Sequence, residues 1–459
     1  MKTFTIFKVA LLLVFTSALL TAQEPNQKSV TITVYNQNLG VVKDVRELNI
    51  SSGISTIKLT DVAQFIDPTS VHIDIDGEVL EQNFQYDLVS MDKILNKYID
   101  KDIQLVSEKG EFIEGKLLSA NGFQIVLQKR DGGLLMLPSA SKYQISVGSL
   151  PDGLITRPTL IWMVNSNNSG KQDVEVSYQT SGMNWHAEYV VVLNEDDTKL
   201  DLNSWVSVEN KSGSTFKNAK LKLVAGDVNL VQKQNRYQPE YDRLYAAKAM
   251  PAVDQFQEKS FFEYHIYDLQ RKTTLANNET KQISLFEAAD VNAEKKYYYG
   301  NRNSYYGSST QKGKVSVIVE FENSKENNLA KPMPKGKVRV YKSDGDALEF
   351  IGEDMIDHTP TKEKVKLKIG EAFDIVVNDV QTENKRISDN VYEQTYEVTI
   401  TNRKKENIVV DVERMMGLNW KILSSSLKYQ KKDSQTILFK VPVKADSKTV
   451  LKYKVRYVH

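Results

Sequence analysis

The chain has 459 residues, of which 41% are hydrophobic, 26% charged and 9% aromatic, and it contains no cysteine. This composition is typical of a folded globular protein, and the length predicts about three domains. The absence of cysteine excludes disulfide scaffolds, zinc ribbons, cysteine-ligated clusters and thiol nucleophiles. Lys and Arg total 60 while Asp and Glu total 59, so the overall charge does not indicate a nucleic-acid or anionic-membrane partner.

The first 22 residues have the pattern of a secretory signal peptide. Lys2 and Lys8 supply positive charge, and Val9–Leu20 is an apolar run shorter than the ~20 residues that a membrane-spanning helix needs. Removing residues 1–22 takes away two lysines and no acid, so the net charge passes from +1 to −1. We expect an exported bacterial protein in the periplasm, on the outer-membrane surface or outside the cell, with no transmembrane segment after signal removal.

Alternation of apolar and polar residues dominates the rest of the chain. It is clearest at the end, where four apolar or aromatic residues alternate with three cations: Leu451, Tyr453, Val455 and Tyr457 with Lys452, Lys454 and Arg456. This pattern predicts strands with one buried and one solvated face. Only Ser90–Tyr98 and Arg243–Gln257 could form longer helices. The predicted fold class is mainly β, with several β-sandwich or immunoglobulin-like units, a small Sm-like or SH3-like barrel, and little helix.

Turn signals divide the chain after the signal peptide into four predicted domains. They are an N-terminal β domain at 28–88, a small barrel-like unit at 90–148, a central β domain at 153–372 and a C-terminal immunoglobulin-like sandwich at 380–459. In the small unit, a helix at Met91–Tyr98 precedes strands at 103–108, 112–120, 122–129 and 134–137. In the last domain, strands are expected at 392–401, 408–414, 436–443 and 449–458.

A flexible, tyrosine-rich insertion is expected to interrupt the central domain at about 232–262 and 288–314. It is rich in Tyr, Asn, Ser and Gly and poor in aliphatic residues, so it buries too little apolar area to offset chain entropy. An aromatic binding arm is the alternative interpretation. The tyrosines concerned are Tyr237, Tyr241, Tyr245, Tyr297, Tyr298, Tyr299, Tyr305 and Tyr306. Ordered strands are expected between the two stretches, at Tyr264–Leu269 and Ile283–Phe286.

Several strings, in order along the chain, resemble the exported bacterial proteins catalogued as domain of unknown function 4139, which have looser relatives in the mucoidy inhibitor family. The resemblance implies an exported, β-rich bacterial protein and transfers no catalytic residue. The strings are Val34–Val42, Ile66–Val71, Leu150–Leu160, Thr180–Trp185, Val208–Gly213, Val224–Asp227, Lys335–Tyr341, Asp357–Pro360 and Gly370–Asp374.

Known catalytic and metal motifs are missing or incomplete. The five histidines, His72, His186, His265, His358 and His459, include no pair at helical metal-ligand spacing. Asp357 and His358 could form an acid–base pair with Glu353 and Asp354 nearby, but adjacent strand residues face opposite sides, which favours a turn-fixing histidine. Residues 344–346 (Asp-Gly-Asp) fit a hairpin turn better than a calcium loop. Residues 307–315 fail the phosphate-loop spacing. No metal or cofactor is predicted.

The remaining candidates for binding are aromatic or basic. Trp162, Trp185, Trp205 and Trp420 could bind a glycan or a partner if exposed, although tryptophan in alternating strands is more often core. Residues 92–145 carry eight cations and seven acids, too balanced a set for nucleic-acid binding.

These observations favour a non-catalytic binding or assembly module of the envelope, with an envelope protein or a glycan as its partner. One alternative is a hydrolase acting on envelope polysaccharide or peptide, so the sequence favours a protein without enzyme activity but does not decide the question. A second alternative, borrowed from the name of the mucoidy relatives, is a periplasmic regulator of exopolysaccharide. The catalytic residues of any such enzyme are not predicted.

Overall fold

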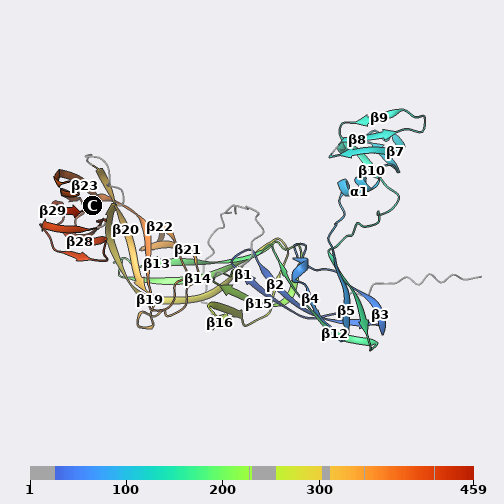
Figure 1. Cartoon of the computed structure of the whole chain (residues 1–459), viewed down its shortest axis with the longest axis horizontal. Helices are drawn as coiled ribbons and strands as arrows, with labels where there is room; N and C mark the ends of the chain where they lie inside the picture. The colour runs from blue at the N-terminus through green and yellow to red at the C-terminus, as the bar shows by residue number, and fades with distance from the viewer. Residues whose placement is uncertain are drawn as a thin grey trace, which may run out of the picture. The chain divides into compact units, whose positions relative to one another are not determined.

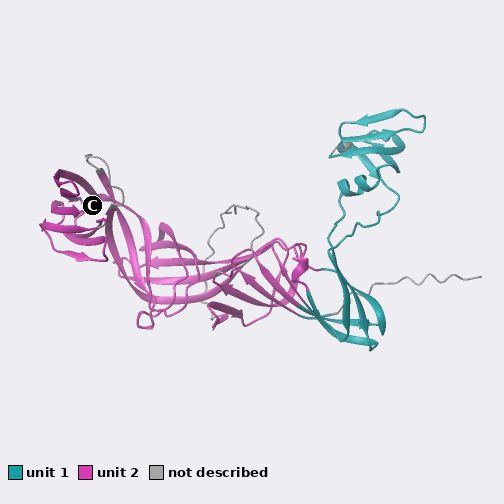
Figure 2. Ribbon diagram, in the orientation of Figure 1, with its two compact units in different colours: residues 1–29, 44–61, 72–176 teal, residues 30–43, 62–71, 177–459 magenta. Residues whose placement is uncertain are grey.

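The computed structural model describes residues 26–122, 124–226, 228–229, 255–301, 311–345, 347–417 and 419–458, and they divide into two compact units. Figure 2 colours unit 1 (1–29, 44–61 and 72–176) teal and unit 2 (30–43, 62–71 and 177–459) magenta. The predicted signal peptide, Tyr237, Tyr241, Tyr245, Tyr305, Tyr306 and His459 lie outside the described residues. Most described residues are in strands, and they include one α-helix, so the predicted mainly β class is confirmed.

Unit 1 contains two separate sheets. The first has the order β3-β11-β5, in which β11 pairs antiparallel with both neighbours. Trp162 at its centre is fully buried and donates a hydrogen bond of 2.9 Å to Gln82 Oε1. The bounds are β3 Gly53–Leu59, β5 Glu78–Gln85 and β11 Thr159–Ser166; β4 His72–Asp74 is not part of this sheet and pairs with β12.

The second sheet of unit 1 is five-stranded, with the order β10-β6-β7-β8-β9, and Figure 1 shows it beside the helix α1. Ser90 caps α1 by accepting a hydrogen bond from the Lys93 N–H. Leu95 lies on the buried face of α1 and packs against the core of the sheet. The bounds are α1 Met91–Lys97, β6 Asp102–Ser107, β7 Phe112–Asn121, β8 Gln124–Gln128, β9 Leu134–Leu137, η2 Ala140–Lys142 and β10 Tyr143–Ser146. The predicted helix and strands are confirmed, but no closed barrel is identified in the described residues.

Unit 2 is dominated by a 13-stranded sheet whose main path is β22-β21-β13-β14-β19-β20-β23-β24-β29-β26. Off this path, β25 lies between β19 and β28, and β28 also pairs with β27. The bounds are β13 Met183–Leu193, β14 Lys199–Asn210, β19 Glu279–Asn301, β20 Gln311–Glu322, η3 Lys325–Asn327, β21 Gly336–Asp344, β22 Ala347–Ile356, β23 Lys364–Ser388, β24 Val391–Asn402, β25 Ile408–Met415, β26 Trp420–Ser425, β27 Tyr429–Lys431, β28 Thr436–Val443 and β29 Ser447–Val458.

A second set of unit 2 strands has the order β16-β17-β15-β1, with β18 beside β15. Trp185 on β13 is buried and donates its indole hydrogen bond to the Val224 carbonyl of β15, which satisfies its one polar atom. The bounds are η1 Pro68–Ser70, β15 Phe216–Ala225, β16 Phe256–Phe261, β17 Tyr264–Leu269 and β18 Thr273–Leu275. The division between the units falls within β1 Asn26–Tyr35 and within two further strands of this sheet, β2 Gly40–Ile50 and β12 Gly170–Thr180.

The C-terminal strands bury one face, as their alternation predicts. Leu451, Tyr453 and Val455 of β29 point into a core with Val398, Ile400 and Phe439, while Lys452 and Lys454 face away. The four strands predicted after residue 390 are confirmed. Two further strands, β26 and β27, were not predicted from the sequence.

The predicted flexible insertion needs correction where the structure describes it. Residues 288–301 belong to β19, residues 311–314 to β20, and Phe256–Phe261 form β16. Most of the segment Arg243–Gln257, where a helix was predicted, lies outside the described residues. Its last two residues, 256 and 257, begin the strand β16. The four-domain division remains a prediction about which parts fold independently.

Candidate functional site

The tyrosine-rich end of β19 has two different faces. Successive strand residues point to opposite sides, so Tyr297 and Tyr299 enter the unit 2 core, with 8% and 4% of their surface exposed. Lys296, Tyr298 and Gly300 point to the other side. This end of β19 is a central strand, because it pairs with β20 on one side and runs parallel to β25 on the other.

The inner face holds a buried ion pair. Arg414 of β25 and Asp379 of β23 are 5% and 6% exposed, and Arg414 Nη2 lies 2.6 Å from Asp379 Oδ2. Tyr299 donates a 2.8 Å hydrogen bond to the same oxygen, and the guanidinium lies over the rings of Tyr299 and Tyr453. Burial alone would lower the pKa of Arg414, but the charges of its neighbours, Asp379 among them, raise it overall, so this group stays a cation.

Gly313 of β20 makes room for this cluster. A Cβ at that position would overlap the Tyr299 ring, because it would lie 2.8 Å from both Cζ and Oη. The close approach of ring and backbone therefore requires glycine. The inner face is a packed core built around the Arg414–Asp379 ion pair, in which Arg414 Nε is buried without a hydrogen-bond partner among the described residues.

The outer face of the same strands is hollowed. A hollow of about 690 Å³ opens over β19, β20, β23, β25 and β28, and we call it the Tyr298 hollow. Its lining combines an aromatic ring, two aliphatic or thioether side chains, two hydroxyls and one charge of each sign. The lining residues are Tyr298, Gly300, Ser316, Ile318, Lys368, Glu413, Met415 and Thr436.

The hydroxyl end of the Tyr298 ring lies close to the backbone of Gly300. A Cβ on Gly300, two residues further on the same face, would be 2.6 Å from Tyr298 Oη, 2.8 Å from Cε1 and 2.9 Å from Cζ. The phenol therefore occupies the space above the Gly300 backbone. A ring in this position forms part of the floor of the hollow.

The charges around the Tyr298 hollow are largely balanced. Glu413 pairs with Lys432 at 2.5 Å. Asp411, on the same face of β25, lies opposite Lys440 in the ladder, and burial raises the pKa of its carboxyl in spite of the Lys440 charge. Lys368 adds one cation to the lining itself.

A second hollow, of about 550 Å³, lies further along β19 and β20 and includes Asn292, Glu294, Glu320, Asn327 and Lys364 in its lining. The Glu320 carboxylate is 2.9 Å from Lys296 Nζ and 3.2 Å from Lys364 Nζ. Burial would raise the pKa of Glu320, but the hydrogen bonds and charges of these lysines lower it overall. Glu320 is therefore a neutralised carboxylate and not a candidate acid.

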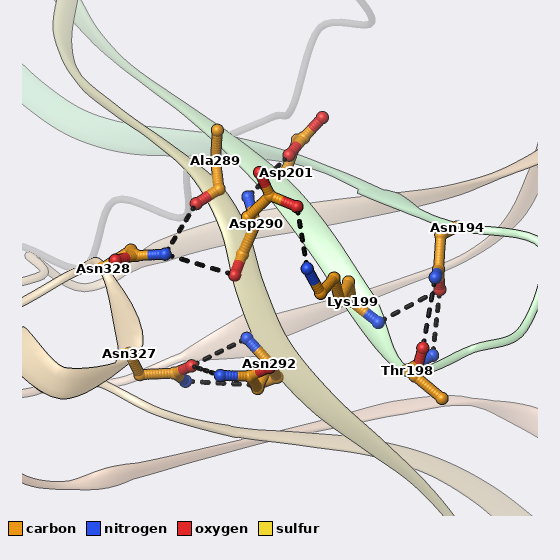
Figure 3. Close-up of polar contacts among 9 residues, drawn as sticks. All are labelled: Asn194, Thr198, Lys199, Asp201, Ala289, Asp290, Asn292, Asn327 and Asn328. Carbon is orange, nitrogen blue, oxygen red and sulfur yellow. Dashed lines mark hydrogen bonds and ion pairs between the residues drawn. The ribbon is translucent and has the colours of Figure 1, made fainter.

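Asparagines hold the wall of this second hollow (Figure 3). Asn327 Oδ1 accepts hydrogen bonds from the Asn292 N–H at 2.7 Å and from Asn292 Nδ2 at 2.9 Å. At a bulge in β19, Asp290 has a φ of 55°, and its N–H donates to Asp201 Oδ1 at 3.0 Å. Asn328 Nδ2 contacts the carbonyls of residues 289 and 290 from the other side (Figure 3). These bonds fix the backbone at the wall of the second hollow.

The acidic residues near His358 do not form a catalytic site with it. His358 Nδ1 accepts a hydrogen bond from the Lys335 N–H at 3.2 Å, which is the turn-fixing role that the sequence favours. The Asp357 side chain is 92% exposed and pairs with Lys335 at 3.7 Å. Asp354 accepts from the Met355 and Lys368 N–H groups, and Glu353 contacts Lys337 and Arg339.

The other sequence candidates are also accounted for where they are described. His186 contacts Glu188 at 3.3 Å, His265 contacts Glu258 at 2.7 Å, and His72 is exposed on β4. Trp162 and Trp185 are core, whereas Trp205 and Trp420 are partly buried. Asp344 and Gly345 form the predicted turn between β21 and β22.

The described part of the chain contains neither a cluster of metal-ligating side chains nor a membrane-spanning helix. No three His, Asp or Glu side chains there form a group that could hold a metal ion. No helix there is long and apolar enough to cross a membrane.

The Tyr298 hollow could not be predicted from the sequence because its residues come from five strands. The available signal was period-two spacing in Lys296, Tyr298 and Gly300, but the neighbouring tyrosines conceal it. Fold and site together define a mainly β protein with a polar hollow on a sheet face.

The family model described as Domain of unknown function (DUF4139) matches residues 174–459, more than half of the chain, so the protein belongs to this family. The resemblance found in the sequence is thereby confirmed over these residues. A comparison with curated proteins finds no significant match.

Proposed function

We propose that this protein is an exported, non-catalytic binding or assembly module of a bacterial cell envelope, and that the Tyr298 hollow holds its partner. The observation that carries the proposal is the hollow itself: about 690 Å³, within the roughly 300–1,000 Å³ of small-ligand sites, lined by an aromatic ring and a few polar groups. Export is supported by the pattern of Lys2, Lys8 and Val9–Leu20.

The lining argues against the competing hydrolase. A glycosidase generally needs two facing carboxyl groups, one of them with a raised pKa. Among the described residues that line the Tyr298 hollow, Glu413 is the one carboxylate, and it pairs with Lys432. A binding role requires none of this chemistry. As finer features of the fold, we propose an immunoglobulin-like sandwich at the C-terminal end and a small Sm-like or SH3-like barrel for the unit that contains the five-stranded sheet.

The test uses the full chain with a C-terminal affinity tag, produced in a bacterial host and cross-linked in intact cells. Ser316→Arg places a long cation in the hollow, and Ser424→Arg makes the same change on an exposed site of β26 that does not line it. We expect all three proteins to be found in the cell-envelope fraction. The wild type and Ser424→Arg should capture the same partner, and Ser316→Arg should capture about tenfold less of it. Equal capture by all three proteins, or a purely cytoplasmic protein, would contradict the proposal.

A further inference from the structure

The near-zero net charge of the chain conceals a basic C-terminal end. Residues 420–458 carry ten Lys and Arg and two Asp, a net charge of +8, whereas residues 23–419 carry 48 cations and 57 acids. The two longest segments outside the described residues after the first 25, 230–254 and 302–310, together carry five cations and three acids, so they add no net negative charge. The ten cations are Lys421, Lys428, Lys431, Lys432, Lys440, Lys444, Lys448, Lys452, Lys454 and Arg456. A segment of this composition can attract a polyanion if its cations lie together on one surface.

Five of these cations do lie together, on one face of two paired strands. Leu451 and Val455 of β29 point into the core, so the residues that alternate with them point to the other side. β26 is the neighbour of β29 and the last strand on the path of the sheet, and its Lys421 lies directly opposite Arg456 in the ladder. We call the surface formed by Lys421, Lys448, Lys452, Lys454 and Arg456 the basic face.

The basic face is long and open to solvent. From Lys448 to Arg456 it extends about 27 Å, at ~3.4 Å for each residue of a strand. The side chains of Lys452 and Arg456 are 60% and 44% exposed. Like charges directly opposite each other in a ladder destabilise strand pairing. The placement of Lys421 opposite Arg456 is therefore not explained by the stability of the sheet.

Carboxylates on the neighbouring strands hold part of the basic face in place. Glu393 of β24 is 8% exposed and lies 2.9 Å from Lys454 Nζ and 2.7 Å from Arg456 Nη2. The other carboxylates within 4 Å of these five cations, among the described residues, belong to Glu383 and Glu397. Three acids thus accompany five cations, and the one that makes the closest contacts is shielded from solvent. The described part of this surface keeps an excess of positive charge.

Hydroxyl groups border the basic face. Thr399 and Thr401 of β24 alternate with the buried Val398 and Ile400, so they lie on the outer side of the sheet, and Thr401 is directly opposite Lys448. Both threonines are partly exposed. A hydroxyl both donates and accepts hydrogen bonds. The outer side of β24 and β29 therefore combines fixed positive charge with neutral hydrogen-bonding groups.

The aromatic residues of the same strands distinguish between the polyanions that could bind here. Trp420 of β26 and Tyr457 of β29 are opposite each other in the ladder and pack against the core, on the side away from the basic face. Peripheral membrane proteins and proteins that bind single-stranded nucleic acid use exposed aromatic rings, which enter the lipid interface or stack on bases. With its described aromatic rings turned inward, this surface instead fits a polyanion that needs only charge and hydrogen bonds.

We propose that the basic face binds a linear acidic polysaccharide, whose carboxylates pair with Lys421, Lys448 and Lys452 and whose hydroxyls bond to the threonines of β24. Lys454 and Arg456, held by Glu393, continue the same row of cations. The five cations are different residues from those described in the lining of the Tyr298 hollow, so this inference goes beyond the proposed function and does not depend on it.

The experiment is calorimetric titration of the full chain with polygalacturonate, which carries a carboxylate on each sugar. Dextran is the neutral comparison, and phosphatidylglycerol vesicles and oligo(dT) are the other polyanions. We expect polygalacturonate to bind at low ionic strength with a dissociation constant of about 0.1 mM or lower. Addition of 0.5 M NaCl should weaken binding at least about tenfold, because these cations are exposed. Dextran should not bind.

A triple variant tests the residues. Lys421→Gln with Lys448→Gln and Lys452→Gln should weaken binding at least about tenfold, whereas Arg at the same three positions keeps the charge and should stay within about threefold of the wild type. The matched control removes three exposed lysines elsewhere in unit 2, at positions 217, 259 and 272, by the same change to Gln. It has the same net charge as the first variant and should bind as the wild type does. Circular dichroism checks that all the variants keep their strands.

Four outcomes overturn the inference. They are no binding of polygalacturonate, equal binding of dextran, tighter binding of the vesicles or of oligo(dT) than of polygalacturonate, and equal losses in the two Gln variants. Lysine at a sheet edge can also serve to prevent association between sheets. If that is the role of these lysines, the first Gln variant will associate in light scattering while binding polygalacturonate normally, and the inference is then wrong.

Discussion

The two faces of the β19 segment 295–300 use the same kinds of residue in opposite ways. On the inner face, Tyr299 donates to Asp379 beside the buried Arg414, and the cluster is closed to solvent. On the outer face, Tyr298 lies over Gly300 and forms part of an open hollow. Tyrosine is therefore part of the core on one side and part of the lining of a hollow on the other, and the difference is set by what lies opposite it in the fold.

The contrast teaches how to separate stability from binding in this protein. An inner-face residue has partners that remain buried when it is removed, so its loss leaves unsatisfied groups in the core. When an outer-face side chain is shortened, water can fill the space and hydrogen-bond to the groups that the side chain contacted. Substitutions on the inner face should therefore lower the free energy of unfolding more than substitutions on the outer face.

The largest effect is expected for Asp379→Ala. It leaves the 5% exposed Arg414 charged and without its carboxylate, which costs about 3–5 kcal/mol in the free energy of unfolding. Urea denaturation measures the loss. Replacing both partners, as in Asp379→Leu with Arg414→Met, should restore most of it because no unpaired charge remains. A loss below about 1 kcal/mol for the single variant would mean that the inner face is not a sealed core.

A pair of glycine substitutions should give an intermediate effect. Gly313→Ala forces a methyl group into the buried Tyr299 ring and should cost about 1–3 kcal/mol. Gly300→Ala meets mainly the hydroxyl end of Tyr298, which can swing toward solvent, so its cost should stay below about 1 kcal/mol. Thermal unfolding of the two variants compares the faces directly, and equal losses would show that Tyr298 is as fixed as Tyr299.

The smallest effect concerns pH and Glu320→Gln on the outer face. The lysines hold the folded-state pKa of Glu320 below its ordinary 4.5, so this group stabilises the fold above about pH 4.5, and the contribution disappears as the pH falls through the folded value. We expect the variant to be about 1 kcal/mol less stable at pH 7 and equal to the wild type in strong acid. Urea titrations from pH 3 to pH 8 check this.

Salt provides the control for that comparison. Lys364 and Lys366 are each 60% exposed, so 0.5 M NaCl should reduce the effect of Glu320→Gln. The same salt should leave the effect of Asp379→Ala nearly unchanged, because the inner pair is buried. A pH-independent difference between Glu320→Gln and the wild type would contradict the proposed role of the lysines.

Where apolar and polar residues alternate, the sequence was sufficient to predict the strand and its buried face. The C-terminal strand around Leu451–Tyr457 is an example. The short helix at Met91–Lys97 was also predicted. The segment at 288–301 was predicted to be flexible because it has few aliphatic residues. It is a strand because Tyr297 and Tyr299 supply buried area of their own and a glycine at 313 admits the second ring.

The candidate site was beyond prediction for a related reason. Three consecutive tyrosines carry no apolar–polar contrast, so the pattern does not say which of them faces the core. Residues 298, 316, 368, 413 and 436 meet only when five strands are paired, and β25 reaches β19 as a parallel neighbour from a distant part of the chain.

By itself, the sequence determined the strand-rich class, the family and the positions of most strands, because these depend on local period-two alternation and on short strings of residues. The tertiary structure decided which tyrosine is core and which lines a hollow, which acid is buried with arginine and which is surrounded by lysines. Those outcomes depend on the register between strands, and register brings together residues that are far apart in the chain.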